Sequence, residues 1–123
     1  MAEAAHPRNG PLTHIRVLDL GRIMAAPWAT QILADLGADV IKIERPGAGD
    51  DTRAWGPPFL RDRDGNATGE SGYFLSVNRG KRSVAVDIAT VEGQQLIRAM
   101  AQLTPALLSS GQIHQAGEQH NHG

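Results

Sequence analysis

The feature that most constrains the fold is an apolar, glycine-punctuated stretch at residues 15–44. Residues 15–20 are rich in branched apolar side chains and precede a glycine, which predicts a strand buried on both faces. Pro27 suits the first turn of a following helix, and Gly37 suits the C-terminal cap of that helix. A second branched run at residues 40–44 completes a β-α-β unit, in which the strands are parallel and the crossover is right-handed. The sequence therefore predicts an α/β fold.

After this unit the chain makes a long irregular excursion and then returns to regular structure. Residues 45–72 carry many glycines and prolines, and a loop of this length in a compact domain is usually functional or disordered. Within it, we expect residues 61–70 to be mobile because they are uniformly polar. Residues 83–87 predict a third strand. A helix should follow from the N-cap residue Thr90, with an apolar stripe formed by Leu96, Ile97, Met100 and Leu103.

Both ends of the chain differ in composition from the middle. Residues 1–12 are small and polar and lack the apolar region of a signal peptide, so we expect a flexible N-terminus and a cytoplasmic location. Residues 13–103 carry the periodic segments. Residues 104–123 begin with a helix-breaking Thr-Pro pair and turn polar, which predicts a disordered C-terminal tail.

Composition excludes several classes of function. The chain has 123 residues, enough for one domain at most, and contains no cysteine for disulfides, thiolate catalysis or cysteine zinc sites. Because 12 basic residues balance 13 acidic ones, net charge gives no reason to expect nucleic acid or a membrane as partner. The tail histidines stand without cysteines or paired acids, so we expect no specific metal site at His114, His120 and His122.

The loop after the first strand is the first candidate for ligand binding. In sheets of this kind ligands bind beyond the carboxyl ends of the parallel strands, where residues 22–27 lie. The loop reads Gly-Arg-Ile-Met-Ala-Ala-Pro rather than G-x-G-x-x-G, and Pro27 removes an N–H donor that a dinucleotide pyrophosphate would use. We therefore expect neither NAD nor FAD.

The second strand ends in Glu44 and Arg45, where nucleotide-binding α/β units contact the ribose. An arginine there accommodates a ribose phosphate, and coenzyme A carries a 3′-phosphate on its ribose. Arg45 is therefore a candidate for binding that phosphate. The alternative is that Arg45 is simply a solvated strand end.

Four sequence blocks resemble those of the class III (CaiB/BaiF-type) CoA-transferases. They lie at residues 16–31, 36–47, 49–59 and 73–83, in the order that the family has, and the resemblance covers residues 11–102. The family includes formyl-CoA transferase, carnitine CoA-transferases and α-methylacyl-CoA racemases. The Glu-Arg-Pro-Gly and Trp-Gly-Pro-Pro runs of this chain are more similar to the transferases than to the racemases.

This resemblance implies a structure and a reaction. The structure would be the N-terminal part of a Rossmann-like large domain, from a homodimer whose two subunits are interlocked. The reaction would be reversible transfer of CoA between an acyl-CoA and a carboxylic acid, with the acyl-CoA as a substrate rather than a tightly bound cofactor. An aspartate would attack the thioester, giving mixed-anhydride and acyl-thioester intermediates.

The resemblance also implies which residues contact coenzyme A. The loop residues Arg22, Ile23, Met24 and Ala25 would border it, and Arg45 would lie near its adenosine end. Some members carry a polar side chain where Met24 stands, a departure that bears on substrate choice. Further contacts in the family fall at positions matching Val86 and Ala89.

The nucleophilic aspartate of the family lies further along than this chain reaches. No aspartate here matches it; Asp19 is expected to cap a turn, and Asp50 and Asp51 to form a loop pair with Asx-type hydrogen bonds. The family pattern also breaks off after Gln102, as a frameshift, an alternative exon or a degraded gene would cause. We therefore expect the chain alone to be inactive. The alternatives are a non-catalytic CoA- or nucleotide-binding module and a non-functional product that does not fold alone.

Overall fold

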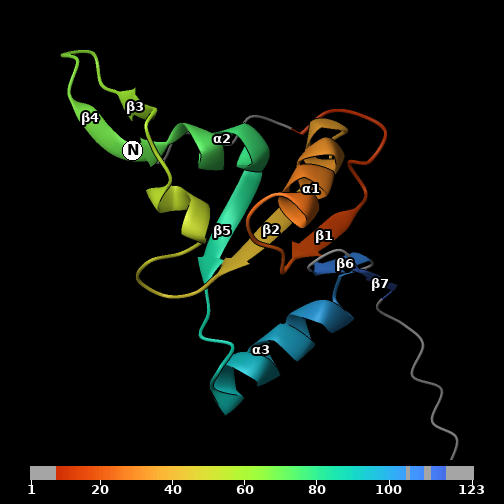
Figure 1. The fold of residues 1–123 in the computed structure, drawn as a ribbon. Coiled ribbons are helices and arrows are strands. Elements are labelled where there is room, and N and C mark those ends of the chain that lie inside the picture. The colour runs from red at the N-terminus through yellow and green to blue at the C-terminus, as the bar shows by residue number, and fades with distance from the viewer. Residues whose placement is uncertain (1–7, 105, 110–111, 116–123) are drawn as a thin grey trace, which may run out of the picture.

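A computed structural model describes residues 8–104, 106–109 and 112–115. A central sheet lies between helices on its two faces, with α1 on one face and α3 on the other (Figure 1). A hairpin of two further strands projects from one corner of this arrangement (Figure 1). The predicted α/β class is confirmed. Among the described residues, no helix is both long and apolar enough to cross a bilayer.

The sheet has five strands in the order β5-β2-β1-β6-β7. The pairs β1–β2, β2–β5 and β1–β6 are parallel, and β7 runs antiparallel to β6. Their bounds are β1 Arg16–Asp19, β2 Asp39–Glu44, β5 Lys81–Ala85, β6 Ala106–Ser109 and β7 Gln112–Gln115. The parallel strands point the same way, so their carboxyl ends lie at one edge of the sheet.

Alternation along β1 and β2 divides the core between the two faces. Val17 and Val40 are buried on the face that packs against Leu33 and Ala34 of α1. Their neighbours Leu18 and Ile43 are buried on the other face, beneath the α3 side chains Ile97, Met100 and Ala101. Both faces of these strands are therefore apolar, as expected of a parallel sheet covered on both sides.

Helix α1 spans Ala25–Asp35 and ends as its sequence predicts. Gly37 adopts a φ of +101°, which side chains with a Cβ rarely tolerate. Its N–H donates to Ala34 O at 2.9 Å, and the Ala38 N–H donates to Leu33 O at 3.0 Å. These two bonds form a Schellman motif, which turns the chain directly into β2.

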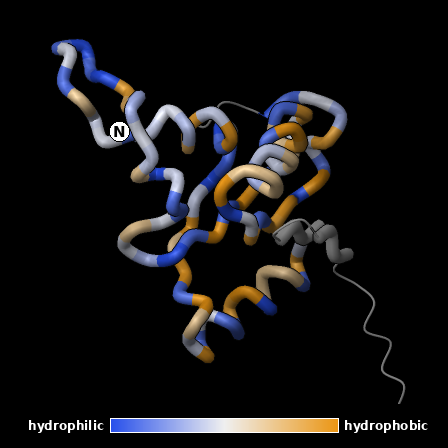
Figure 2. The backbone as a smooth tube through the Cα atoms, viewed as in Figure 1, coloured by the Kyte–Doolittle hydropathy of each residue, from blue (hydrophilic) through white to orange (hydrophobic). Residues whose placement is uncertain are grey.

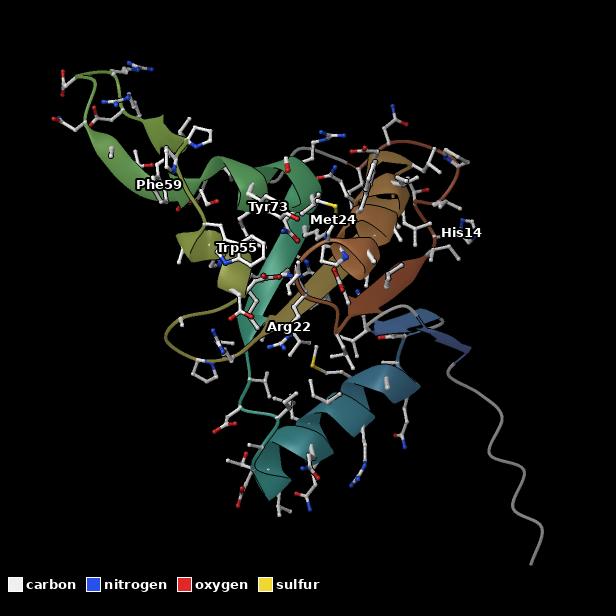
Figure 3. All side chains as sticks on the ribbon, viewed as in Figure 1. His14, Arg22, Met24, Trp55, Phe59 and Tyr73 are labelled. Carbon is white, nitrogen blue, oxygen red and sulfur yellow. The ribbon has the colours of Figure 1, made fainter. Side chains whose placement is uncertain are left out.

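Between β2 and β5 the chain forms regular secondary structure, although its many glycines and prolines predicted an irregular loop. This region contains the short helix η1 (Asp51–Ala54), strands β3 (Phe59–Arg61) and β4 (Ala67–Ser71), and helix α2 (Gly72–Asn78). Trp55 packs edge-on against Tyr73, with ring centroids 5.2 Å apart (Figure 3). Residues 61–70, predicted to be mobile, belong to the antiparallel β3–β4 hairpin, whose exposed tip is hydrophilic (Figure 2).

Helix α3 spans Val91–Gln102 and begins at the predicted cap. The Thr90 hydroxyl accepts the Gly93 N–H at 3.0 Å, and Glu92 lies in the first turn. The preceding strand differs slightly from its prediction, because β5 begins at Lys81 and ends at Ala85.

The structure describes part of each end of the chain. Leu12, expected to lie in a flexible segment, donates its N–H to Leu36 O at 2.9 Å and packs against the Val17 cluster. The tail, expected to be disordered, contributes β6 and β7. The physical reason is main-chain pairing, because β6 satisfies the free edge of β1 without a distinctive side-chain pattern. Residues 1–7, 105, 110–111 and 116–123, with His120 and His122, lie outside the described residues.

Candidate ligand-binding cleft

A cleft of about 310 Å³ opens at the carboxyl edge of the parallel strands. The ends of three strands that are neighbours in the sheet supply most of its lining. They are residues 20–22 after β1, residues 43–45 at the end of β2, and residues 86–89 after β5. Gly49 and Asp51, from the loop after β2, complete the wall. This is the place where open α/β sheets bind ligands.

Two arginines and one carboxylate share the rim of the cleft. Arg22 Nη1 lies 3.5 Å from Asp51 Oδ2, and Arg45 Nη2 donates to the other oxygen of the same carboxylate. Arg45 Nε also donates to Gly49 O at 2.9 Å. More than half of each arginine side chain is exposed, 65% for Arg22 and 54% for Arg45. An anion in the cleft could therefore reach both guanidinium groups by replacing Asp51 as their partner.

The loop between β1 and α1 forms part of the cleft wall, and carboxylate side chains accept hydrogen bonds from its backbone. Asp19 Oδ1 accepts the Gly21 N–H at 2.8 Å, the turn cap predicted from the sequence. Ile23 adopts a φ of +70°, and its N–H donates to the carboxylate of Asp50 at 3.2 and 3.3 Å. The shape of the loop therefore depends on two carboxylates outside it.

Two buried ion pairs lie beneath this loop. Lys42 Nζ is 2.9 Å from Asp50 Oδ2, and Lys81 Nζ is 3.0 Å from Asp19 Oδ2; all four side chains are at most 2% exposed. Burial lowers the pKa of Lys81 to about 8, and the attraction of Asp19 only partly offsets this. The adjacent residues Lys81 and Arg82 therefore differ, because the lysine is buried and the arginine is exposed.

Glu44, at the end of β2, is also engaged by several donors. Arg53 donates to both carboxylate oxygens at 2.8 and 2.7 Å, Ser83 donates its hydroxyl, and the Asp50 N–H donates at 2.8 Å. Burial alone would raise the pKa of Glu44, but these hydrogen bonds outweigh it and lower the pKa to about 2. Glu44 is therefore an ionised structural anchor, unsuited to act as an acid or base near neutral pH.

The accessible arginines make the cleft better suited to an anionic ligand than to a metal ion. Within residues 8–104, 106–109 and 112–115, no group of three His, Cys, Asp or Glu side chains could hold a metal ion. The carboxylates of Asp19, Glu44 and Asp50 are buried and bonded to cations. Nucleophilic attack by any of these three carboxylates would require breaking those bonds, whereas the two rim arginines are accessible.

Comparison with known proteins decides the family. A family model described as CoA-transferase family III matches residues 12–115. The chain belongs to this family. The match extends beyond residue 102, where the resemblance seen in the sequence ended, and takes in β6 and β7.

Among family III relatives, the chain is 48% identical over 103 residues to succinate–glutarate CoA-transferase of Agrobacterium fabrum and 55% identical over 91 residues to succinyl-CoA:glutarate CoA-transferase of Mus musculus. These matches cover 84% and 74% of this chain but 26% and 19% of the relatives. A CAIB/BAIF family protein from Brucella suis has a similar structure, with a TM-score of 0.73 and 46% identity over 83% of this chain and 26% of that one. The chain thus spans about a quarter of the length of such relatives.

The residues predicted to contact CoA are only partly brought together. Arg22 and Arg45 meet at the cleft, together with Val86 and Ala89. Ile23, Met24 and Ala25 are not part of its lining; Met24 is the N-cap of α1 and is 37% exposed. Figure 3 shows Met24 on the side of α2, away from Arg22.

Sequence reasoning missed three charged residues that shape the site. Asp51 joins the rim arginines, while Lys42 and Asp50 lie beneath the loop. The signal for Lys42 was present, because a lysine within the apolar run Val-Ile-Lys-Ile-Glu breaks the pattern of a buried strand. A buried lysine requires a buried partner, which could have directed attention to the aspartates of the following loop.

Proposed function

We propose that this chain supplies a CoA-binding cleft of a family III CoA-transferase, an enzyme that transfers CoA between an acyl-CoA and a carboxylic acid. One observation carries the proposal: two accessible arginines, Arg22 and Arg45, border a cleft at the carboxyl edge of the sheet. Coenzyme A presents phosphates that such a pair can bind.

Arg45 is proposed to bind the 3′-phosphate on the ribose. Its guanidinium can present two parallel N–H donors to a phosphate, a geometry that a lysine lacks. Apolar side chains of Val86 and Ile88 on the opposite wall suit the adenine ring. The loop at residues 22–25 is proposed to border the rest of the carrier, with the acyl-CoA as a substrate that comes and goes.

The relatives support a proposal for the reacting acids. Two of them are named for transfer between succinate and glutarate, so we propose succinyl-CoA as donor and a dicarboxylic acid such as glutarate as acceptor. The complete reaction, and a family-type homodimer, are proposed for the assembly in which this chain takes part. For the chain alone we expect binding without turnover, because Glu44 and Asp51 in the cleft lining are paired with arginines and Asp87 accepts the Ala89 N–H. Product formation by the purified chain would contradict this.

Isothermal titration calorimetry with CoA and dephospho-CoA tests the role of Arg45. We expect wild-type protein to bind CoA about tenfold more tightly, since a charge-assisted contact to the 3′-phosphate is lost in dephospho-CoA. Arg45→Gln should remove that difference. Arg63→Gln, which changes an exposed arginine of the β3–β4 hairpin, should preserve it. Equal affinity of the wild-type protein for both ligands would remove Arg45 from the phosphate site.

A further inference from the structure

We propose that Lys42 and Asp50 are positioning residues, whose buried ion pair holds the loop between β1 and α1 in the shape that borders the cleft. This inference rests on the proposed function for its consequence, because the shape of the loop matters for CoA only if the cleft binds CoA. The positioning itself concerns contacts within the chain and can be measured separately.

The loop adopts a conformation that its own residues do not favour. Ile23 has a φ of +70°, in a region that β-branched side chains rarely occupy because of steric crowding at Cβ. The loop is also tightly packed at Gly21, since a Cβ built there would lie 2.2 Å from the Ala26 Cβ. Such a loop persists only when the surrounding structure determines it.

The Lys42–Asp50 pair supplies that support through main-chain contacts. Lys42 Nζ donates to Gly21 O at 3.0 Å, and the Asp50 carboxylate accepts the Ile23 N–H at 3.2 and 3.3 Å. Lys42 and Asp50 are 2.9 Å apart and each side chain is 1% exposed. One ion pair therefore fixes a carbonyl and an amide two residues apart, on either side of Arg22.

Stability alone is a weak explanation for this pair. Removing two charges from water costs as much as their attraction returns, and apolar residues of similar volume often serve a core equally well. Lys42 lies between Ile41 and Ile43, where an apolar residue would continue the strand. An apolar pair could not form hydrogen bonds with the backbone of the loop. These bonds therefore indicate what the two charges are for.

The position of Asp50 is fixed by a contact with Glu44, the last residue of β2. The Asp50 N–H donates to Glu44 Oε1 at 2.8 Å. Gly49, with a φ of +68°, allows the approach, because a Cβ built there would lie 2.7 Å from the same oxygen. The end of β2 thus places the residue that shapes the loop after β1, and two walls of the cleft are coupled.

Asp50→Asn separates the loop contacts from the other role of Asp50. Asp50 Oδ1 caps η1 by accepting the Thr52 N–H at 3.0 Å and its hydroxyl at 2.8 Å, and an asparagine oxygen can keep both bonds. The amide nitrogen then replaces Oδ2, where it faces the ammonium of Lys42 and the N–H of Ile23 as a third donor, so that Ile23 keeps only its 3.3 Å contact with Oδ1. Thr52→Val is the matched control, because it removes only the hydroxyl that donates to Asp50 Oδ1 and leaves the contacts of Asp50 with the loop in place.

Two readouts test the proposal: amide hydrogen exchange at Ile23 by NMR, and CoA affinity by calorimetry. In Asp50→Asn we expect about tenfold faster exchange of the Ile23 amide and about tenfold weaker CoA binding, consistent with loss of a charged hydrogen bond. In Thr52→Val we expect neither change, even if the protein melts at a lower temperature. If Asp50→Asn does not fold, Lys42→Met combined with Asp50→Asn removes the clash of donors and should show the same two effects.

The outcomes separate this proposal from the proposed function. Wild-type protein that does not bind CoA would overturn the function, while faster exchange in Asp50→Asn would still support the positioning role. Exchange at Ile23 that matches the Thr52→Val control would overturn the positioning role, whatever the CoA affinity. Faster exchange with unchanged CoA affinity would overturn the link between loop shape and the carrier.

Discussion

The two edges of the parallel sheet both carry clusters of opposite charges, yet the clusters differ in burial and in what they bind. At the carboxyl edge, Asp19 is paired with the ammonium group of Lys81, a side chain that extends from the start of β5; both side chains are almost completely buried and bond to backbone groups as well as to each other. At the amino edge, Asp39 accepts from Arg16 and Arg82, whose side chains are 50% and 63% exposed. The first cluster shapes a loop, whereas the second joins side chains at the surface.

This difference teaches that a concentration of charge does not by itself identify a site. A hollow of about 250 Å³ also lies at the amino edge, lined in part by Arg8, Arg16 and Asp39. There the arginines gather around one carboxylate, and among the described residues none of them bonds to a loop with a positive-φ side-chain residue such as Ile23. At the carboxyl edge the buried charges are bonded to the main chain that forms the cleft, so substitutions there should have larger effects.

The largest effect is expected for Asp19→Ala at the carboxyl edge. The change leaves Lys81 buried without its partner and removes acceptors for the Gly21 N–H and the Thr30 hydroxyl. We expect a loss of about 3–5 kcal/mol in the free energy of unfolding, measured by urea denaturation followed by circular dichroism. The loss should shrink as pH rises through about 8, because Lys81 of the wild-type protein then releases its proton and its charge pairing with Asp19 is lost. A loss no greater than that of an exposed pair would break the comparison.

An intermediate effect on the free energy of unfolding is expected for Glu44, and its size should depend on pH. Its pKa is about 2 in the folded protein against an ordinary value of 4.5, so its ionised form stabilises the fold. This stabilisation, roughly 3 kcal/mol from the shift, is complete above pH 4.5 and is lost as pH falls toward 2. Unfolding of Glu44→Gln should therefore differ most from wild type at neutral pH and least near pH 2. A constant difference across that range would show that the loss arises from packing alone.

The sequence predicted the parallel unit at residues 15–44 because both of its signals are local. Branched apolar runs indicate buried strands, and Gly37 marks the end of the helix between them. The β3–β4 hairpin and the pairing of β6 with β1 were not predictable in this way. Both depend on main-chain hydrogen bonds between segments of weak side-chain pattern.

The site was predicted in part for the same reason. Strand order alone places Arg22 and Arg45 at one edge of the sheet, where the structure brings both to the cleft. Nothing local in the sequence shows that Asp51 joins them or that Asp50 reaches Ile23, since those contacts depend on the path of the loop after β2. Such contacts between loops can be identified only from the three-dimensional structure.

The smallest effect is expected for Arg16→Gln at the amino edge. Asp39 would keep Arg82, which donates to both of its oxygens at 3.0 and 2.7 Å, and no buried charge would be left without a partner. Half-exposed pairs of this kind contribute about 0–1 kcal/mol and weaken with added salt. The free energy of unfolding should therefore fall by less than about 1 kcal/mol, and by still less in about 1 M salt. A loss as large as that of Asp19→Ala would mean that Asp39 depends on all its arginines, and burial would no longer explain the difference between the two edges.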